Sequence, residues 1–469
     1  MKKFAKLCAL SLSALLVPFC FAGCGGTGGG GGGLPQLDEA PSYLEERTMW
    51  IGAWDNPPAT EAAYKTMQDC GITMVYVWNG NNQGVTPNLA LHLELGEKYG
   101  IKVFPHLSAS KTATEVDVMN EQWLDVYDDH PALGGFNYMD EPGGDAFEGL
   151  GALAENHNTN YASVDYYVNL YPTSFYAQNG ANGIMYKTYD EYVADYCEKI
   201  VSKLTDTRRI LSFDHYCMSL GNGYGYLSET WLQTVETIAD YAKQYDAETI
   251  AFLLTTKHHN YLAQTYESLR YQANVYMAYG VRGLSHFTYS TGSWGDNSPV
   301  DNSGLPRGDG RLYYAMAQLN GELLSWDDVY LDFTWQEVMQ VYGSEEEYEN
   351  ELFSWSEHSA ESISFVEEVT ATKDALIGHF EDSNGNKGLM VTNFEFPEAL
   401  TTEANDGVAD APDFSSLGNN IVTLKIPSAN AAYVIVNGEM QLIEVENETI
   451  ELSLEPAGAA FVIPMNLAN

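Results

Sequence analysis

Apolar residues form two alternating patterns along the chain between Met49 and about residue 324. Short runs rich in β-branched and aromatic residues are typical of strands, and the longer stretches between them have the spacing of helices. The strand candidates are Met49–Asp55, Ile72–Asn79, Ile101–Ala109, Leu133–Asp140, Tyr166–Pro172, Arg209–Tyr216, Thr249–Thr255 and Arg282–Tyr289. Strands that alternate with helices in this way indicate a parallel sheet with crossover helices.

Several of the expected helices end in a glycine just before the next strand. The helices are expected at Ala59–Cys70, Leu89–Tyr99, Tyr189–Leu204, Glu229–Tyr245, Ala263–Tyr279 and, after the last strand, Leu312–Leu324. Gly71, Gly100 and Gly280 suit a left-handed C-cap. Eight strand–helix units predict an α/β fold, a (β/α)8 TIM barrel over residues 45–330. A doubly wound open sheet is the alternative, but no Gly-rich phosphate loop follows the first strand.

From about Thr334 the pattern changes to short alternating strands joined by turns. Asn384-Gly385 and Asn437-Gly438 are typical hairpin turns, and each follows an apolar run. Further strands are expected at Ile450–Leu454 and Ala459–Ile463. Residues 331–469 are therefore predicted to form a small antiparallel β-sandwich.

The N-terminus has the pattern of an export signal. Three lysines among the first six residues precede an apolar run, Leu7 to Phe19, that is too short to span a bilayer. Phe21-Ala22-Gly23-Cys24 resembles a bacterial lipobox, which implies removal of residues 1–23 and lipidation of Cys24. Residues 24–44 begin with a Gly-rich tether. We therefore expect an extracytoplasmic lipoprotein, on the cell surface or the periplasmic face, that is held to the membrane only by lipid.

Composition narrows the range of partners. Lys and Arg number 22 against 65 Asp and Glu, a formal net charge of −43, which argues against nucleic acid and against an anionic membrane surface. Aromatic residues make up 13% of the chain, with 32 Tyr and 9 Trp, and such rings commonly stack on sugars. The cysteines beyond Cys24 match no metal-binding spacing and are expected to be buried thiols. No cofactor and no metal are expected.

The candidate chemistry lies at the ends of the predicted strands. Gly134 to Pro142 reads as an apolar strand that ends in the carboxylates Asp140 and Glu141. In a (β/α)8 barrel this end of a strand carries the chemistry, and a carboxyl among aromatic residues suits a general acid of raised pKa. An N-capping pair that opens the next helix is the other interpretation. Polar and aromatic residues expected to converge with this pair are Trp54, Asp55, Trp78, Asn79, His106, Asn169, Tyr171, Asp214, His215, Tyr216, Lys257, His258, His259, His286, Tyr289 and Trp294.

Together these motifs resemble clan A, the large retaining clan of (β/α)8-barrel glycoside hydrolases, and within that superfamily certain barrel lipoproteins. The resemblance covers about Met49 to Leu324. It rests on Asp140-Glu141-Pro142, Asn169-Leu170-Tyr171-Pro172, Asp214-His215-Tyr216, Arg270-Tyr271-Gln272 and Ala278-Tyr279-Gly280. It implies hydrolysis of O-glycosidic bonds with Glu141 as the acid/base. The sequence departs from the clan in two places, because Asp140 replaces the usual Asn and the seventh strand ends in Thr255 to His259 without a carboxylate.

The second catalytic group is therefore open. Asp214 is the preferred candidate, as nucleophile or as base for an inverting water. Asp140 could instead orient a substrate acetamide, as in hexosaminidases, and Asp55, Asp296 or Asp301 are further candidates. A lyase would need a Tyr or Lys base near a basic patch that binds a uronate, and Lys257 is the lone cation among the predicted strand ends. A carbohydrate-binding lipoprotein without turnover is the alternative from another class.

Overall fold

The computed structural model describes residues 33–43, 47–78, 89–107, 127–173, 186–290, 297–345, 350–354, 356, 359–402 and 409–468. The chain divides into two units, Met1–Gly32 and Gly33–Asn469, and all described residues belong to the second. Within the described ranges, no helix has both the length and the apolar character that crossing a membrane would require. Cys24 and the expected tether up to residue 32 lie outside these ranges.

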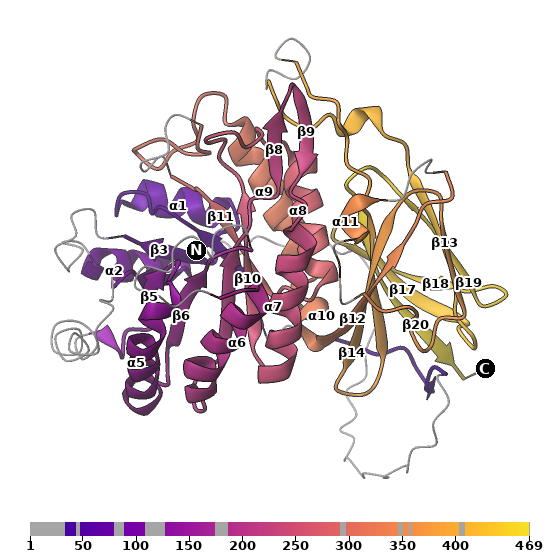
Figure 1. The fold of residues 1–469 in the computed structure, drawn as a ribbon, viewed down its shortest axis with the longest axis horizontal. Helices are drawn as coiled ribbons and strands as arrows, with labels where there is room; N and C mark the ends of the chain where they lie inside the picture. Colours follow the sequence, from indigo (N-terminus) through magenta and orange to yellow (C-terminus); the bar gives the residue numbers. More distant parts are fainter. Residues whose placement is uncertain are drawn as a thin grey trace, which may run out of the picture. The chain divides into compact units, whose positions relative to one another are not determined.

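Eight parallel strands form the barrel, and they fall in the eight predicted places (Figure 1). They are β2 (Trp50–Ala53), β3 (Met74–Val77), β4 (Lys102–Pro105), β5 (Gly135–Asp140), β6 (Asp165–Leu170), β7 (Ile210–Asp214), β10 (Glu248–Leu254) and β11 (Gly283–Phe287). Their order is β4-β3-β2-β11-β10-β7-β6-β5. Parallel bridges from Val103 to Leu133 and from His106 to Asn137 join β4 to β5 and complete the ring.

Helices follow the strands and cover the outside of the sheet. They are α1 (Glu61–Asp69), α2 (Leu89–Tyr99), α5 (Phe147–Asn160), α6 (Tyr189–Lys199), α7 (Trp231–Tyr245), α8 (Tyr266–Ala278), α9 (Arg311–Leu323) and α10 (Asp327–Asp332), with 3-10 turns η3 (Gly144–Ala146) and η4 (Val201–Lys203). Thr60, Thr188 and Thr265 cap the starts of α1, α6 and α8 with their hydroxyls. The predicted left-handed glycines are confirmed, with φ of 75° at Gly71, 71° at Gly100 and 77° at Gly280.

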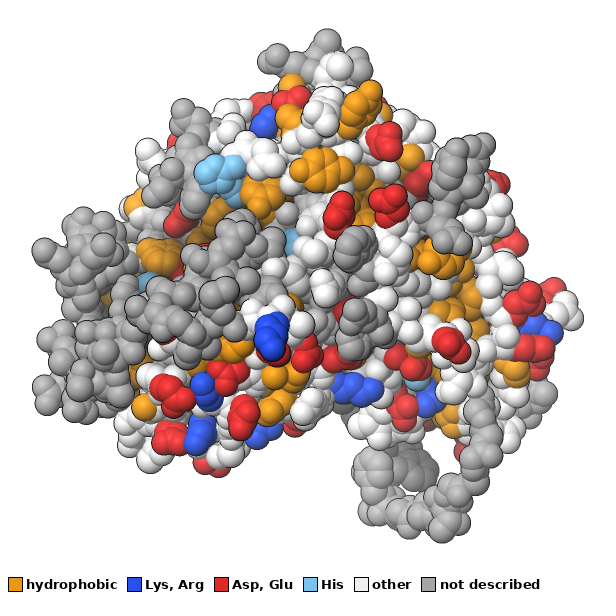
Figure 2. Space-filling view, in the orientation of Figure 1, with side chains coloured by type: hydrophobic (Ala, Val, Ile, Leu, Met, Phe, Trp, Pro, Cys, Tyr) orange, Lys and Arg blue, Asp and Glu red, His pale blue; other side chains and the backbone are white. Residues whose placement is uncertain are grey.

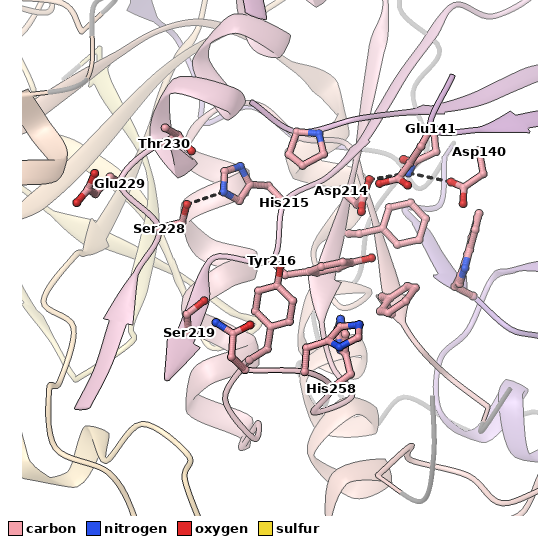
Figure 3. Close-up of a pocket in the computed structure, with 18 of the residues that line it drawn as sticks. Asp140, Glu141, Asp214, His215, Tyr216, Ser219, Ser228, Glu229, Thr230 and His258 are labelled. Atoms are coloured by element: carbon pink, nitrogen blue, oxygen red, sulfur yellow. Dashed lines mark hydrogen bonds between the residues drawn. The ribbon is translucent and has the colours of Figure 1, made fainter. Parts of the chain in front are cut away.

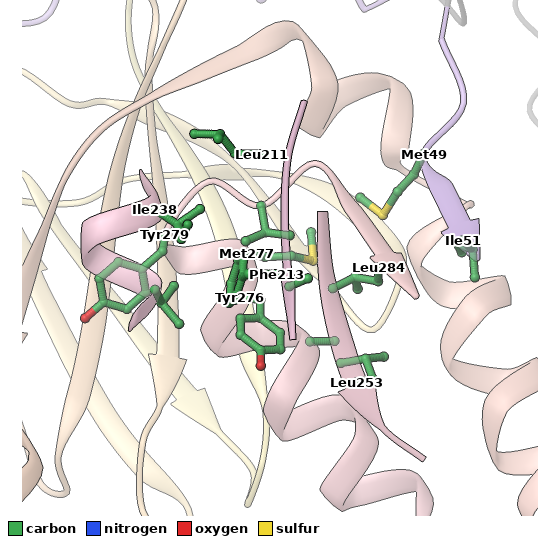
Figure 4. Packing of buried hydrophobic residues seen from close by; sticks show 14 of the residues in the cluster. Met49, Ile51, Leu211, Phe213, Ile238, Leu253, Tyr276, Met277, Tyr279 and Leu284 are labelled. Atoms are coloured by element: carbon green, nitrogen blue, oxygen red, sulfur yellow. The ribbon is translucent and has the colours of Figure 1, made fainter. Parts of the chain in front are cut away.

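Alternation along each strand separates an outer apolar layer from the barrel interior. Leu211 and Phe213 of β7 and Leu253 of β10 point outward and pack with Tyr276 and Met277 of α8 (Figure 4). The intervening residues of the strands point inward, where a second cluster of bulky side chains fills the barrel. That cluster comprises Trp54, Met74, Tyr76, Phe104, Tyr167, Ile210, Ile250, Phe252 and Phe287.

A chain of hydroxyl groups crosses this apolar interior. The Tyr76 hydroxyl lies 3.0 Å from Ser285 Oγ and donates to the Tyr167 hydroxyl at 2.8 Å, which lies 2.5 Å from Ser212 Oγ. Ser212 Oγ then donates to Asn169 Oδ1 at 2.9 Å. Buried polar groups cost free energy unless they are hydrogen-bonded, so the chain stabilises one arrangement of the interior and ends at the mouth of the barrel.

The C-terminal strands form the predicted β-sandwich. One sheet has the order β12-β14-β15-β20-β17-β18, with β1 paired to β20, and the other has the order β13-β16-β19. The strands are β1 (Gln36–Leu37), β12 (Phe333–Val341), β13 (Glu368–Ala371), β14 (Ala375–Asp382), β15 (Lys387–Asn393), β16 (Asn420–Lys425), β17 (Ala431–Val436), β18 (Glu439–Glu444), β19 (Thr449–Leu454) and β20 (Ala459–Leu467); α11 (Glu351–Ser354) and η5 (Phe414–Ser416) lie between strands. Asn437 and Gly438 both have positive φ, as the predicted hairpin turn requires. An apolar cluster with members from both sheets forms the core of the sandwich.

Helix α8 joins the barrel to the sandwich. Arg270, with 7% of its side chain exposed, donates to Asn437 Oδ1 at 3.1 Å, Glu455 Oε1 at 3.2 Å and the Pro456 carbonyl at 2.9 Å. A Cβ at Gly378 of β14 would lie 2.0 Å from the carbonyl oxygen of Ala278. Only a glycine therefore lets the sheet approach the end of α8 this closely.

Candidate active site

A pocket of about 600 Å³ opens at the C-terminal ends of the barrel strands (Figure 3). Asp140 is the last residue of β5, Glu141 follows it, and Asp214 is the last residue of β7. All three carboxylates line this pocket. The other lining residues are Trp54, Asn169, Pro172, His215, Tyr216, Ser219, Tyr226, Ser228, Glu229, Thr230, Phe252, His258, His259, Asn260, Tyr261 and Phe287.

Asn169 holds two of the carboxylates together. Its amide nitrogen donates to Asp214 Oδ1 at 2.9 Å and to Asp140 Oδ1 at 3.3 Å, as the dashed lines in Figure 3 show. Because its carbonyl oxygen already accepts the hydrogen bond from Ser212, the amide NH₂ must face the carboxylates. The hydroxyl chain inside the barrel therefore sets the orientation of the amide at its mouth.

Glu141 occupies an unusual backbone position. Its φ is 47°, in the left-handed region that a glutamate seldom adopts, and Pro142 follows it. Its N–H donates to the Asn169 carbonyl at 2.8 Å, so β6 holds this conformation. Such a conformation typically costs about 1–3 kcal/mol and is common where a side chain has to be aimed into a site. Glu141 does not begin a helix, since the next helical turn, η3, starts at Gly144.

Burial raises the pKa of each carboxyl, and neighbouring carboxylates raise those of Asp140 and Glu141 further. Burial, the nearby Asp214 and Asp55 raise the pKa of Asp140 to about 7, against the lowering effect of the Asn169 hydrogen bond. The pKa of Glu141 is raised by burial, Asp214 and Asp140. Burial also raises the pKa of Asp214, but hydrogen bonds from Asn169 and the Tyr216 hydroxyl oppose that effect. The arrangement therefore favours a proton on Glu141 and a negative charge on Asp214.

Aromatic rings form the floor and one wall of the pocket. Trp54 meets Phe252 edge-on with ring centroids 5.0 Å apart, and Tyr216 lies 4.8 Å from Phe287. Tyr261 packs edge-on against Tyr216 at 5.5 Å. The pocket thus combines acidic groups with apolar planes, which is the combination that polar ring-shaped ligands need.

Hydrogen bonds hold His215 and His258 at the pocket. His215 Nδ1 lies 2.8 Å from Thr234 Oγ1 and its Nε2 lies 2.9 Å from Ser228 Oγ, and burial lowers its pKa to about 3. A neutral ring with both nitrogens engaged ties β7 to the start of α7 and is not available as a proton donor. His258 Nδ1 lies 2.7 Å from the Thr256 carbonyl, and its ring faces the pocket beside Tyr216.

Some residues expected at the site lie beside the pocket and do not line it. Trp78 stacks on His106, with ring centroids 3.9 Å apart, outside the lining residues. Asp55 is half-buried with a φ of 62°, and burial raises its pKa to about 6. Burial and, after it, the nearby carboxylates of Glu141, Asp140 and Asp214 raise the pKa of Tyr171 to about 12. Tyr289 is fully buried, and Asn79 and Trp294 lie outside the described residues.

The other candidates for a second catalytic group do not line the pocket or lie outside the described residues. The end of β10 carries Thr255 and Thr256, which hydrogen-bond to His286 and to the Thr288 carbonyl. Lys257 does not line the pocket, and its Nζ lies 2.7 Å from Asp410 Oδ2 of the sandwich. Asp301 accepts the N–H groups of Ser303 and Leu305 in a turn, and Asp296 lies outside the described residues.

A hairpin that the strand prediction did not include forms another wall. Strands β8 (Met218–Gly221) and β9 (Tyr224–Leu227) are antiparallel, and Ser219 and Tyr226 line the pocket. The turn between them is Asn222-Gly223, with φ of 54° and 85°. This dipeptide between apolar residues is a hairpin signal, so the sequence contained the information that would have found it.

No protein-family profile matches the chain, and no curated protein matches it by sequence. Solved structures with a similar fold include an alpha-amylase from Anoxybacillus (10% identity over 90% of this chain and 100% of that chain, TM-score 0.46). A glucosidase from Croceicoccus marinus shares 11% identity over 91% of this chain and 98% of that chain, with a TM-score of 0.41. A beta-galactosidase from Halorubrum lacusprofundi shares 13% identity over 59% of this chain, with a TM-score of 0.38, and the chain spans only 58% of its length. These neighbours are distant, so the chemistry of this chain follows only from its own site.

Proposed function

We propose that this protein is a glycoside hydrolase that cleaves O-glycosidic bonds of an oligo- or polysaccharide. The observation that carries the proposal is the meeting of Glu141, Asp140 and Asp214 in one aromatic-lined pocket at the mouth of the barrel. Cleavage of a glycosidic bond needs a proton for the leaving oxygen and a second carboxylate at the oxocarbenium-like centre. A pocket that keeps Glu141 protonated and Asp214 charged meets this need.

In this proposal Glu141 delivers the proton to the leaving oxygen. Every cause that acts on the pKa of Glu141 raises it, so the group holds its proton at neutral pH. Asp214 is the second carboxylate, because the hydrogen bonds from Asn169 and Tyr216 stabilise its charge. Asp140 shares the Asn169 amide with Asp214 and raises the pKa of Glu141, which gives it a supporting role in holding the proton on the acid.

Two observations support other roles for this pocket. Asp140 is adjacent to Glu141 and could orient a substrate acetamide, in which case only substrates with an N-acetyl group would react. The end of β10 lacks a carboxylate, which would suit a carbohydrate-binding protein that keeps the pocket without turnover. The test must therefore separate binding from cleavage.

Ligands would first be found on a glycan array with the Glu141→Gln variant, which keeps the shape of the pocket and removes the acid. Each bound glycan would then be incubated with the wild type, and products would be measured by chromatography. We expect cleavage by the wild type and a loss of at least about 100-fold in Glu141→Gln. A glycan that the wild type binds and leaves intact would show that the protein is a binder.

We also propose that the chain is exported and anchored to the outer face of a membrane by lipid on Cys24. The support is the basic and apolar pattern of residues 1–23, the lipobox-like Phe21-Ala22-Gly23-Cys24 and the tether over residues 24–44. Expression with a radiolabelled fatty acid should label the wild type and leave Cys24→Ala unlabelled. A labelled Cys24→Ala variant, or an unlabelled wild type, would refute the anchor.

A further inference from the structure

The hairpin β8–β9 presents two exposed tyrosines on the face that borders the pocket. In its register Ser219 pairs with Tyr226 and Gly221 pairs with Tyr224. Side chains two residues apart on a strand share one face, so these four residues lie on the same side. Since Ser219 and Tyr226 line the pocket, Tyr224 lies on that same face, one pair farther toward the tip and outside the pocket.

The small partners opposite the tyrosines leave room for their rings. A Cβ on Gly221 would lie 2.8 Å from Cε1 of Tyr226, so the Tyr226 ring lies across Gly221 toward Tyr224. Tyr224 is 61% exposed and Tyr226 is 48% exposed. Two large rings, side by side on one face of a hairpin and about half or more exposed, form an apolar surface next to the pocket, of the kind that binds ligands.

The opposite face and the edges of the hairpin are fixed to the rest of the protein. The Gly225 N–H donates to the Glu398 carbonyl of the sandwich at 3.3 Å, and a Cβ on Gly225 would touch Leu400 and Leu262. The Leu220 N–H donates to the Asn260 carbonyl at 2.7 Å, and Ser219 bridges to Tyr261. The tyrosine face is therefore held open on a supported hairpin.

Aromatic residues lie between this face and the carboxylates. Tyr216 hydrogen-bonds to Asp214, Tyr261 packs on Tyr216, and Tyr226 and Tyr261 both line the pocket. Tyr224 then extends the series beyond the pocket, about 7 Å along the strand from Tyr226. The series leads from the reacting groups to the tip of the hairpin.

We propose that Tyr226 and Tyr224 form a stacking platform for successive sugar units of an oligosaccharide whose chain runs from the pocket along β9. The ligand class, carbohydrate, rests on the proposed function. The platform adds that the protein binds an extended glycan, since one sugar unit in the pocket would leave Tyr224 uncovered. Affinity should therefore rise with chain length until the platform is filled.

Binding would be measured by calorimetry on the full chain carrying Glu141→Gln, which prevents turnover. The probes are cello-, xylo-, manno- and malto-oligosaccharides of one to six units. For at least one series we expect the longest member to bind at least about tenfold more tightly than the monosaccharide. Tyr224→Ala should weaken binding of the longest member about five- to tenfold and leave the shortest bound member unchanged.

Two further variants separate stacking from folding. Tyr224→Trp keeps a ring on the platform and should retain the dependence on chain length. Tyr314→Ala removes a tyrosine that is 62% exposed on α9, which matches Tyr224 in exposure, and should leave every affinity unchanged.

The platform is refuted if no series binds more tightly with length, or if Tyr224→Ala weakens short and long members alike. It is also refuted if Tyr224→Ala alters only the oligomeric state in sedimentation, since the tyrosines would then contact a second copy of the chain. Failure of the proposed function looks different. In that case the wild type would show length-dependent binding with intact glycans, and the platform would stand.

Discussion

The two ends of the barrel treat buried carboxylates in opposite ways. At the N-terminal end, Arg208 forms ion pairs with two carboxylates. Its Nη2 lies 2.6 Å from Asp165 Oδ2 at the start of β6, and its Nη1 lies 3.1 Å from Glu248 Oε2 at the start of β10. The guanidinium also stacks over Trp50, 3.5 Å from its ring centroid. At the C-terminal end Asp140, Glu141, Asp214 and Glu229 line one pocket, and its described lining residues include no lysine or arginine.

Burial acts on the pKa in the same direction at both ends, and the cation makes the difference. Burial raises the pKa of Asp165, and Arg208 offsets part of that rise. At the pocket, neighbouring carboxylates add to the effect of burial and raise the pKa values further. The barrel thus pairs buried charges with a cation at one end and gathers carboxyls without one in the pocket at the other. This is the division expected if the pocket carries the proposed proton transfer and the opposite end serves stability. The Asp and Glu side chains on the surface, red in Figure 2, are a different group from the buried carboxylates at the two ends of the barrel, because they face solvent.

The largest effect is expected from substitution at the pocket. Glu141→Gln should lower kcat/KM about 10³-fold on a glycan and much less on a 2,4-dinitrophenyl glycoside, whose leaving group needs no proton. Asp214→Asn should lower both by similar factors. Glu248→Gln, a carboxylate at the other end, should stay within about twofold of the wild type. If Glu141→Gln lowers both substrates equally, Glu141 is not the acid.

The largest effect on stability is expected at the opposite end. Arg208→Met leaves Asp165, whose side chain is 12% exposed, without its cation and should lower the free energy of unfolding by about 3 kcal/mol. Adding Asp165→Asn to Arg208→Met should restore part of the loss. As a control, Lys65→Met breaks the exposed pair with Asp69 and should change stability by less than about 0.5 kcal/mol. Urea denaturation measures all three, and equal losses in Arg208→Met and Lys65→Met would contradict the comparison.

A smaller, pH-dependent effect is expected from Asp140→Asn. The pKa of Asp140 rises from an ordinary 3.8 to about 7 in the fold, so both folded and unfolded states hold the proton below about pH 4. As the pH rises toward 7 the unfolded state loses its proton first, and the folded state loses stability. The amide removes this loss, so the variant should be more stable than the wild type at pH 8 by more than about 1 kcal/mol and equal to it near pH 4.

The same substitution also removes a charge beside Glu141. Its pKa should fall, because one cause of its rise is gone, and the alkaline limb of the kcat/KM profile should move to lower pH. Denaturation at pH 4 and 8 and the pH–rate profile provide the two measurements. A variant that is less stable than the wild type at pH 8 would show that Asp140 is ionised and paired in the fold.

The smallest effect is expected at Lys257. Its side chain is 30% exposed and that of Asp410 is 44% exposed, so Lys257→Met should cost less than about 1 kcal/mol and change kcat/KM by less than about threefold. Asp410→Asn should have an effect of similar size. A loss of 100-fold or more in Lys257→Met alone would favour a lyase with a lysine base.

The outline of the fold was readable from the sequence because its signals are local. All eight barrel strands occur where apolar runs predicted them, and Gly71, Gly100 and Gly280 have the left-handed φ that their positions indicated. The Asn437-Gly438 turn was predicted for the same reason, since a turn depends on the φ preferences of two residues. The hairpin at Asn222-Gly223 had an equally local signal, although the short strands beside it carry two glycines and no β-branched residue.

The sequence by itself determined which residues stand at the strand ends, and so placed Asp140, Glu141, Asn169 and Asp214 at one end of the barrel. Only the tertiary structure decided which of these side chains share a pocket, because this depends on strand stagger and on contacts between segments far apart in the chain. In the folded protein Trp78 and His106 stack beside the pocket, and both ring nitrogens of His215 are within hydrogen-bond distance of hydroxyl groups. Lys257 forms an ion pair with Asp410. It also decided the protonation of the carboxylates, because burial and neighbouring charges act through space and leave no trace in local sequence.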